Sequence, residues 1–499
     1  MVGSSWKLRG VREGGIRRGR GEFRGADWGE AKETMPLNEN AEPDVPPRRT
    51  ILWTEMFVAS AISMAILLNG FAVGYSYPAL TSLLKSTPTE PRPPEIYWLN
   101  DCVPLAIAVG SLLGCPLITY IGRKYSLIGT GVPFFISWIV VASSSNLYSL
   151  IAGRVLTGLC VGVIYSAFPV YIVETVRPEL RGALGVLPIA FRNSDMYTLA
   201  YVAAALSVPI FLLFFVTPDS PRWYIAKGRE HKARKALQWL RGKNYNIENE
   251  MEALTQFQIE ADKTRGSAFK QMFYTENTPT ILIPLGLMIF KQLSGTYILI
   301  QFYVTRIEYG SIDSESQGIL TVIISVLSVI VAIVLVDIIG RKMLLYISSG
   351  SIIVSLSILG VLAYVKESNY DISFGSLPQL CLLLHVFGST VGYESISCLM
   401  LGEILPLNIR GTAASLITSI NWLCIFCMGN SFNNMIRSIY EYGFLFTFIS
   451  IHLVAIFFVR FCVPETRGKS LEEIENNLTQ RVKTIKDGIG TGMNTDENL

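Results

Sequence analysis

The sequence predicts an all-α polytopic membrane protein built from two helical bundles. Half of its 499 residues are apolar and only 16% are charged, which makes the chain more apolar than a soluble protein of this size. Runs of about 20 apolar residues, long enough to cross roughly 30 Å of hydrocarbon, recur along it. Because a backbone in lipid must satisfy its own hydrogen bonds within each segment, we interpret these runs as helices rather than strands.

Ten apolar runs have the length of a spanning helix. They lie near residues 56–78, 97–119, 126–145, 149–172, 279–305, 318–337, 343–364, 377–401, 411–431 and 441–463. A polar segment at 218–278 separates a first bundle, 55–217, from a second bundle, 279–463. The remaining segments, 1–54 and 464–499, are predicted to be polar tails.

The polar segments predict the orientation of the chain. Residues 1–54 lack the apolar run of a signal peptide, and we expect them to form a disordered tail. Translation is expected to start at either Met1 or Met35. In the central segment, a helix from Glu230 to Gly242 would place its Ala and Leu side chains on one face and its basic side chains opposite. The excess of Lys and Arg there indicates the cytoplasmic side. The prediction is a multi-pass protein of the plasma membrane with both termini in the cytoplasm.

Three motifs occur in the same order in both bundles. The pairs are Gly122-Arg123-Lys124 with Gly340-Arg341-Lys342, Glu174 and Arg181-Gly182 with Glu403 and Arg410-Gly411, and Pro218-Asp219-Ser220 with Pro464-Glu465-Thr466. Three cues in one order indicate an internal duplication. Parallel repeats are typical of membrane transporters.

The charged residues of these motifs are candidates for a gate. At cytoplasmic helix ends, opposite charges would hold the two halves together while the protein is open to the outside, and would separate when it opens inward. The candidate gating residues are Arg123, Arg154, Glu174, Arg181, Arg341, Glu403 and Arg410. For one Gly-Arg-Lys motif alone, the alternative is a positively charged helix-end turn.

With these motifs, the chain resembles the sugar porter family of the major facilitator superfamily, and within it the insect facilitated trehalose transporters. The resemblance covers about residues 55–478. It is carried by Gly122-Arg123-Lys124, Gly153-Arg154, 174–182, 218–223, 292–295, 337–342, 402–411, Asn421-Trp422 and 464–471. It implies twelve helices in two six-helix bundles and alternating access around a central sugar site. It also implies transport without an enzymatic reaction and without a cofactor.

The resemblance places the sugar site mainly on helices 7, 8, 10 and 11 of the family. Amide and hydroxyl groups there match the sugar hydroxyls, and aromatic rings cover the C–H faces. Gln292 matches the second glutamine of the helix 7 motif, Asn421 matches the helix 11 asparagine, and Trp422 matches an aromatic residue of the cavity wall.

Other candidate substrate-binding residues depart from the family pattern. Lys291 replaces a glutamine, Tyr297 and Ser325 replace asparagines, and 394–398, ending in Cys398, replaces a Gly-Pro-Ile-Pro-Trp run. A glucose-like binding mode is therefore not expected residue by residue.

Lys291 and Glu394 are both charged within apolar helices, at positions that should face the central site. An isolated charge there is costly, so we predict an ion pair or a hydrogen-bonded pair across helices 7 and 10. The alternative is that each side chain independently contacts water. We interpret His385, on helix 10, as a packing residue rather than a proton relay.

The duplication also reveals a shortage in the first bundle. Arg410 and Pro464 are 54 positions apart, whereas their counterparts Arg181 and Pro218 are only 37 apart. Two helices of about 20 residues do not fit within 182–217, so helices 5–6 are expected to be shortened. The alternatives are two spans of about 17 residues, a re-entrant segment covered by protein, or a sequence that lacks part of these helices, which we favour.

The leading functional prediction is facilitative transport of trehalose or a hexose. The first helix has no carboxylate after Glu55, which disfavours proton symport, although Glu394 keeps symport as an alternative. A second alternative is a sugar sensor without transport, or a degenerate paralogue. The net charge of +3 and the cysteine spacing indicate neither nucleic-acid binding nor a metal site. The expected partners are a small sugar and the lipid bilayer, with no obligate protein partner.

Overall fold

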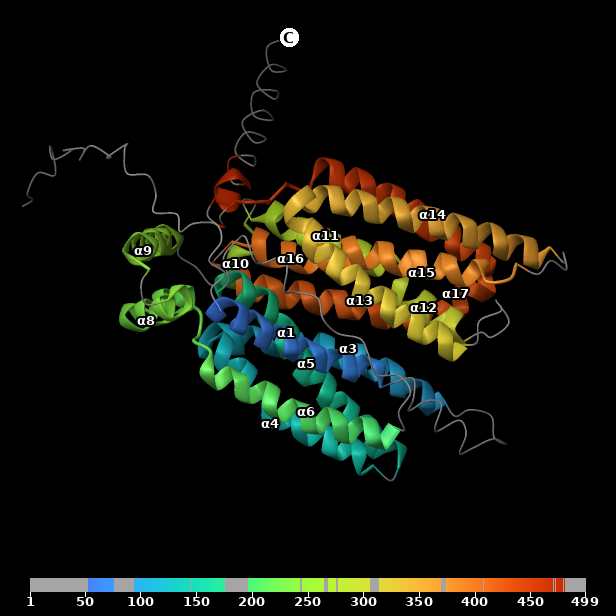
Figure 1. The fold of residues 1–499 in the computed structure, drawn as a ribbon, viewed down its shortest axis with the longest axis horizontal. Helices are drawn as coiled ribbons and strands as arrows, with labels where there is room; N and C mark the ends of the chain where they lie inside the picture. The colour runs from blue at the N-terminus through green and yellow to red at the C-terminus, as the bar shows by residue number, and fades with distance from the viewer. Residues whose placement is uncertain are drawn as a thin grey trace, which may run out of the picture. The chain divides into compact units, whose positions relative to one another are not determined.

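The computed structural model describes residues 53–75, 94–175, 196–305, 314–368 and 374–480, except 145, 243–244, 264–267, 275–276, 407, 470, 472 and 479. Every regular element within these ranges is a helix (Figure 1). Eight helices in this described part are long and apolar enough to cross a membrane. Each of the ten predicted apolar runs coincides with one or more helices, which confirms the fold class.

The first bundle is arranged around one long helix, α5. Its helices are α1 (Trp53–Gly74), α3 (Pro94–Pro116) continued by the π-turn η1 (Leu117–Ile121), α4 (Arg123–Ala142), α5 (Leu147–Thr175) and α6 (Met196–Val216). α5 packs against α1, α3 and α4. The core contains Ile62, Phe134, Trp138 and Tyr171.

The second bundle contains two interrupted helices. Its elements are α11 (Thr278–Gln292), α12 (Thr296–Thr305), α13 (Ser314–Ile339), α14 (Arg341–Glu367), α15 (Leu377–Ser389), the π-turn η4 (Thr390–Glu394), α16 (Ser395–Ile404) and α17 (Arg410–Phe461). α11 and α12 are separated at Gly295, whose φ is +73°. Tyr440 has non-helical angles within α17, which divides that helix into two spans.

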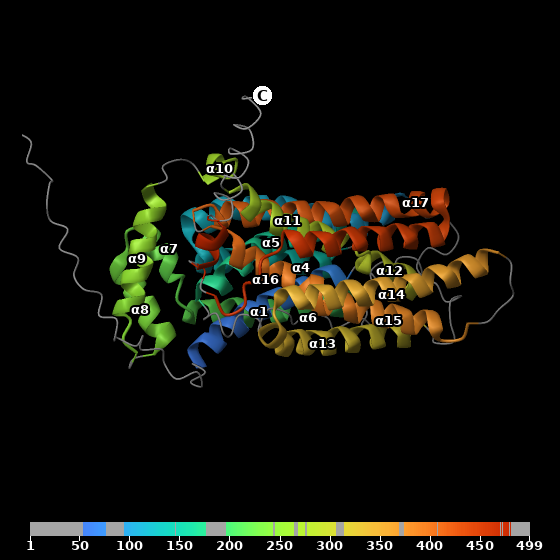
Figure 2. The same ribbon diagram turned by 90° about the horizontal axis from the view of Figure 1, so that it is seen from above.

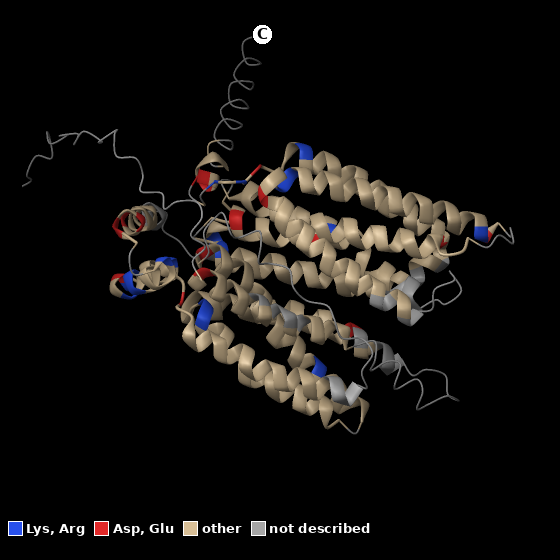
Figure 3. Cartoon of the chain, in the orientation of Figure 1, with Lys and Arg blue, Asp and Glu red and all other residues tan. Residues whose placement is uncertain are grey.

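Four short helices form a polar insert at one end of the bundles, which we call the loop end (Figure 2). They are α7 (Pro221–Ala226), α8 (Glu230–Arg241), α9 (Glu248–Lys263) and α10 (Ala268–Gln271). Charged residues are concentrated on α8 and α9 and at the loop end (Figure 3). The predicted apolar face of α8 is buried against its neighbours through Ala233, Ala236, Leu237 and Leu240.

The insert is attached to the first turn of α1. The Thr54 hydroxyl donates a hydrogen bond to the Leu240 carbonyl, at 2.8 Å. The Arg241 guanidinium contacts the buried carboxylate of Glu55 and, at 2.7 Å, that of Glu250. Burial alone would lower the pKa of Arg241, but these two carboxylates raise it above its ordinary value. The attachment of α8 to α1 therefore remains charged.

The helix α6 occupies most of the short segment of the first bundle. It is 21 residues long, so two equal spans of about 17 residues do not occur. Phe211 lies against Phe134 and Lys124 donates to the Thr217 carbonyl, so α6 runs antiparallel to α4. Since the Tyr171 hydroxyl reaches Thr217 at 3.2 Å, α5 and α6 both end at the loop end. The connection, 176–195, lies outside the described residues. The two remaining alternatives, a re-entrant segment or a missing part of helices 5–6, concern this connection.

The duplicated motifs form the same structure twice. Asp219 accepts hydrogen bonds from the first two backbone N–H groups of α4, at 3.2 and 3.3 Å. Glu465 accepts from the first two of α14, at 3.1 and 3.0 Å. Both helices follow a glycine with positive φ, +107° at Gly122 and +91° at Gly340. The geometry confirms the duplication, with an acidic residue at the positive end of each helix dipole.

Gly122→Ala is expected to destabilise the protein by about 1–3 kcal/mol, because alanine is strained at this φ. A Cβ atom there would also collide with the Asp219 carboxylate. Gly129→Ala, within α4, is the matched control, because its Cβ atom would meet nothing within 4 Å. Thermal unfolding in detergent should show a lower Tm for the first variant alone. Equal Tm values for the two variants would contradict the expected strain.

Candidate functional site

Gln292 and Asn421, the two polar residues that match the family pattern directly, contact each other. Gln292 ends α11, and its Nε2 donates to Oδ1 of Asn421 on α17 at 2.7 Å. Both side chains are buried. Within the described ranges, Oε1 of Gln292 and Nδ2 of Asn421 form no other hydrogen bond. The Gln292 oxygen thus remains as a hydrogen-bond acceptor and the Asn421 nitrogen as a donor, and a sugar hydroxyl can pair with either of them.

Lys291 and Glu394 form the predicted ion pair. The Lys291 Nζ lies 2.7 Å from Oε2 of Glu394. Glu394 is the last residue of the π-turn η4, an element that frequently occurs at functional sites. Cys398, four residues further along the chain, lies on α16 and is half-buried. The pair therefore links α11 to helix 10 beside the Gln292–Asn421 contact.

Aromatic side chains from both bundles border this site. Tyr165 of α5 packs edge to face on Trp422 of α17, with ring centroids 5.4 Å apart. Tyr297 of α12 packs against the cores of both bundles. The site therefore lies between α5 of the first bundle and α11, η4 and α17 of the second.

The Ser325 hydroxyl, another predicted candidate, is used within its own helix. It donates to the Thr321 carbonyl of α13 at 2.8 Å, and Ser325 is buried. The structure therefore places Ser325 in the second bundle without bringing its hydroxyl to the Gln292–Asn421 pair.

His385 is buried beside the break between α11 and α12. Its Nε2 lies 3.1 Å from the Thr296 hydroxyl, and its Nδ1 lies 3.3 Å from the Ser355 hydroxyl of α14. The Thr296 hydroxyl also lies 2.8 Å from that of Ser294. With partners at both ring nitrogens, His385 has the contacts of a packing residue.

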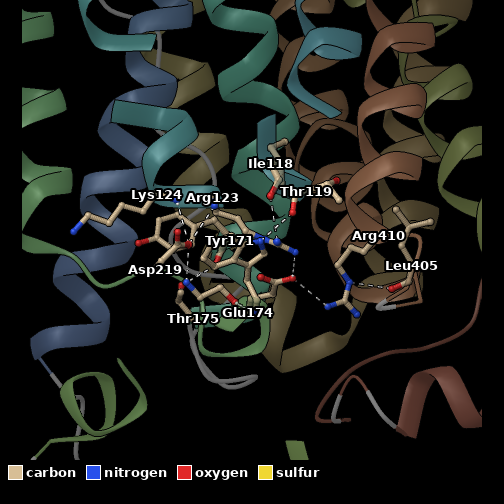
Figure 4. Close-up of polar contacts among 12 residues, drawn as sticks. Ile118, Thr119, Arg123, Lys124, Tyr171, Glu174, Thr175, Asp219, Leu405 and Arg410 are labelled. Atoms are coloured by element: carbon tan, nitrogen blue, oxygen red, sulfur yellow. Dashed lines mark hydrogen bonds and ion pairs between the residues drawn. The ribbon is translucent and has the colours of Figure 1, made fainter. Parts of the chain in front are cut away.

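At the loop end, Glu174 joins the two bundles (Figure 4). Its Oε1 lies 2.9 Å from Nη2 of Arg123 on α4 and 3.8 Å from Nη1 of Arg410 at the start of α17. All three residues are buried. One carboxylate is therefore shared between an arginine of its own bundle and an arginine of the other bundle.

The corresponding cluster of the second bundle has different partners. Arg341 contacts Glu403 at 3.3 Å and Asp337 at 3.1 Å. The other oxygen of Glu403 accepts from the Thr466 hydroxyl at 2.6 Å. Arg181, the counterpart of Arg410, lies outside the described residues. Glu174 thus contacts the opposite bundle. The described contacts of its counterpart Glu403, by contrast, remain within the second bundle.

The assignment of Arg154 to the loop-end cluster is wrong. α5 is unbroken, and Arg154 precedes Glu174 by 20 positions on it, or about 30 Å at 1.5 Å per residue. The Arg154 guanidinium instead donates to the Ala72 carbonyl of α1 and lies 5.2 Å from the ring centroid of Tyr75. It is completely buried near the opposite end of the first bundle.

Three residues of these sites were not among the sequence candidates. Asp337 carries a usable signal, because it precedes Arg341 by one helical turn. Thr466 belongs to a duplicated motif, but its bond to Glu403 has no sequence signal. Tyr165 lies on a helix that is apolar on nearly every side, so helical periodicity does not select it.

Comparisons with known proteins agree with this architecture. The family model described as "Sugar (and other) transporter" matches residues 56–191 and 189–478. The two matches meet within the connection between α5 and α6.

Two insect relatives are named facilitated trehalose transporter Tret1. The Bombyx mori protein is 44% identical over 466 residues, which are 90% of this chain and 92% of the relative. The Drosophila mojavensis protein is 40% identical over 453 residues, 87% of this chain and 52% of the relative. The chain thus spans about half the length of the Drosophila relative.

Solved structures show the same fold. The major facilitator proton:xylose symporter XylE, bound to 6-bromo-6-deoxy-D-glucose, superposes with a TM-score of 0.75 at 20% identity, covering 85% of this chain and 99% of that chain. The inward open conformation of XylE from E. coli gives a TM-score of 0.61 at 20% identity, with the same coverage. Since the family match extends over both bundles, and the helices, duplicated motifs and relatives agree with it, this multi-pass membrane protein belongs to the sugar transporter family and has the major facilitator fold.

Proposed function

We propose that the chain is a facilitative carrier that moves trehalose or a hexose across the plasma membrane, down its gradient. The main support is the buried Gln292–Asn421 pair, which retains a donor and an acceptor for sugar hydroxyls. Trp422 and Tyr165 offer aromatic surface beside it, as sugar C–H faces require. Because the relatives are named facilitated trehalose transporters, trehalose is the first substrate to test.

We further propose that the loop end is cytoplasmic and acts as the inner gate. The basic residues of α8 support this orientation, which also places both termini in the cytoplasm. The contacts of Glu174 with Arg123 and Arg410 would hold this end closed in an outward-facing state. Their separation would open the inward-facing state.

Proton-coupled symport is the second candidate, because Glu394 is an ionisable residue in the central site. A proton on Glu394 would break its ion pair with Lys291. The pair thus opposes the protonation cycle that symport requires. Facilitative transport predicts that uptake does not exceed equilibration and does not depend on an imposed proton gradient.

Uptake of labelled trehalose and glucose by oocytes tests the proposal, with surface protein quantified. We expect saturable uptake, reduced about tenfold or more by Gln292→Ala, because a buried partner in the site is lost. Gln256→Ala, the same change on the exposed surface of α9, is the control and should leave uptake unchanged. Surface protein without flux of either sugar would contradict the proposal and favour a sensor.

A further inference from the structure

The two members of the Lys291–Glu394 pair differ in exposure. The Lys291 side chain is 10% exposed, whereas the Glu394 side chain is 36% exposed. The Lys291 side chain is therefore shielded by protein, while the Glu394 side chain is partly accessible. A ligand that enters the site meets the acidic member of the pair.

Glu394 lies on the side of helix 10 that contacts α11. Tyr393, the preceding residue, points toward α14, where its hydroxyl lies 2.9 Å from that of Ser349. Ser397, one turn after Glu394, points toward α11, where it donates to the Leu287 carbonyl at 3.3 Å. Lys291, the partner of Glu394, immediately precedes Gln292 on α11. Glu394 thus lies near the Gln292–Asn421 pair.

We propose that Glu394 binds two adjacent hydroxyl groups of the substrate and so selects sugars that carry a vicinal diol. This inference rests on the proposed transport function. A carboxylate has two oxygens with about four acceptor positions, so Oε2 can hold Lys291 and still accept from a hydroxyl. Hydroxyl groups on neighbouring carbons match the spacing of the two carboxylate oxygens. Lys291 is the positioning residue, because its ammonium holds the carboxylate in one orientation.

Charge determines which class of ligand fits. Lys291 already neutralises Glu394, so a cationic ligand gains little attraction, and an anionic one would face the carboxylate. A neutral polyol instead donates charge-assisted hydrogen bonds, which are roughly twice as strong as those between neutral groups. A site built to accept from a hydroxyl discriminates strongly against an analogue that lacks it.

The test measures how monodeoxy glucoses inhibit uptake of the labelled sugar by protein reconstituted in vesicles. In the unaltered protein, removal of either hydroxyl of one adjacent pair should weaken inhibition about tenfold or more. In the neutral double variant Lys291→Met/Glu394→Gln, this discrimination should fall below about threefold. Lys291→Arg should retain it, because the charge on the positioning residue remains. The Tm of each variant reports its folding.

Undiminished discrimination in the double variant would overturn the inference while leaving transport established. Gln292→Ala should weaken sugar binding but keep the discrimination at the adjacent pair of hydroxyls, so a general loss of affinity is distinguishable from lost diol selection. If the double variant does not fold, Glu394→Asp replaces it, because its shorter side chain keeps the charge but withdraws the carboxylate. Unchanged discrimination in Glu394→Asp would also overturn the inference. Absence of inhibition by any sugar in the unaltered protein would instead contradict the proposed function.

Discussion

Glu174→Gln is expected to shift the protein strongly toward a state that is open at the loop end. The substitution removes the carboxylate shared by Arg123 and Arg410, which are 7% and 1% exposed. Breaking a buried ion pair typically costs about 3–5 kcal/mol. This cost falls on the closed state alone, because opening would admit water to both guanidinium groups. We therefore expect the open-to-closed ratio to rise at least about tenfold.

Spin labels at Lys227 and Lys469 provide the measurement. Both residues are exposed at the loop end, one just after each bundle, and the native cysteines would be replaced by serine. The distance distribution should shift to longer values in Glu174→Gln. Glu403→Gln is the matched control and should shift it less, because Arg341 keeps Asp337 at 3.1 Å. Equal shifts in the two variants would contradict the unequal roles of the two clusters.

The second large effect concerns the central ion pair. Glu394→Gln is expected to destabilise the protein by about 3 kcal/mol or more, because it leaves the shielded Lys291 ammonium without its carboxylate. Lys291→Met should be less harmful, since the Glu394 carboxylate is partly accessible. The double variant should recover at least half of the loss, because replacement of both charges removes the uncompensated one.

Thermal unfolding in detergent and the yield of monodisperse protein would order these variants. The expected order of decreasing stability is the unaltered protein, the double variant, Lys291→Met and Glu394→Gln. Lys469→Met, at an exposed position, controls for loss of a lysine. A double variant no more stable than either single variant would show that the two charges are energetically independent.

The sequence was sufficient to predict the helices, the duplication and the ion pair, each for a physical reason. The duplicated acidic residues Asp219 and Glu465 contact equivalent helix ends, because the same motif order forms the same local geometry. Lys291 and Glu394 were paired from the cost of an isolated charge in an apolar helix. This argument needs no knowledge of the distance between them.

The position of Tyr165 required the three-dimensional structure, whereas that of Arg154 did not. The predicted run 149–172 already places Arg154 near the start of one helix and Glu174 just past its end, and the unbroken length of α5 confirms this separation. The contact of Tyr165 with Trp422 depends on how the two bundles face each other. Hydrophobic periodicity carries no signal for that arrangement.

The attachment of α8 to α1 has a practical consequence. Because Thr54 and Glu55 hold Leu240 and Arg241, the insert should move as a rigid extension of the first bundle. An antibody fragment bound to the exposed face of α8 would then serve as a fiducial marker for electron microscopy. Its tilt relative to α14 would give the rocking angle of each conformational state, even where the membrane helices themselves are poorly contrasted.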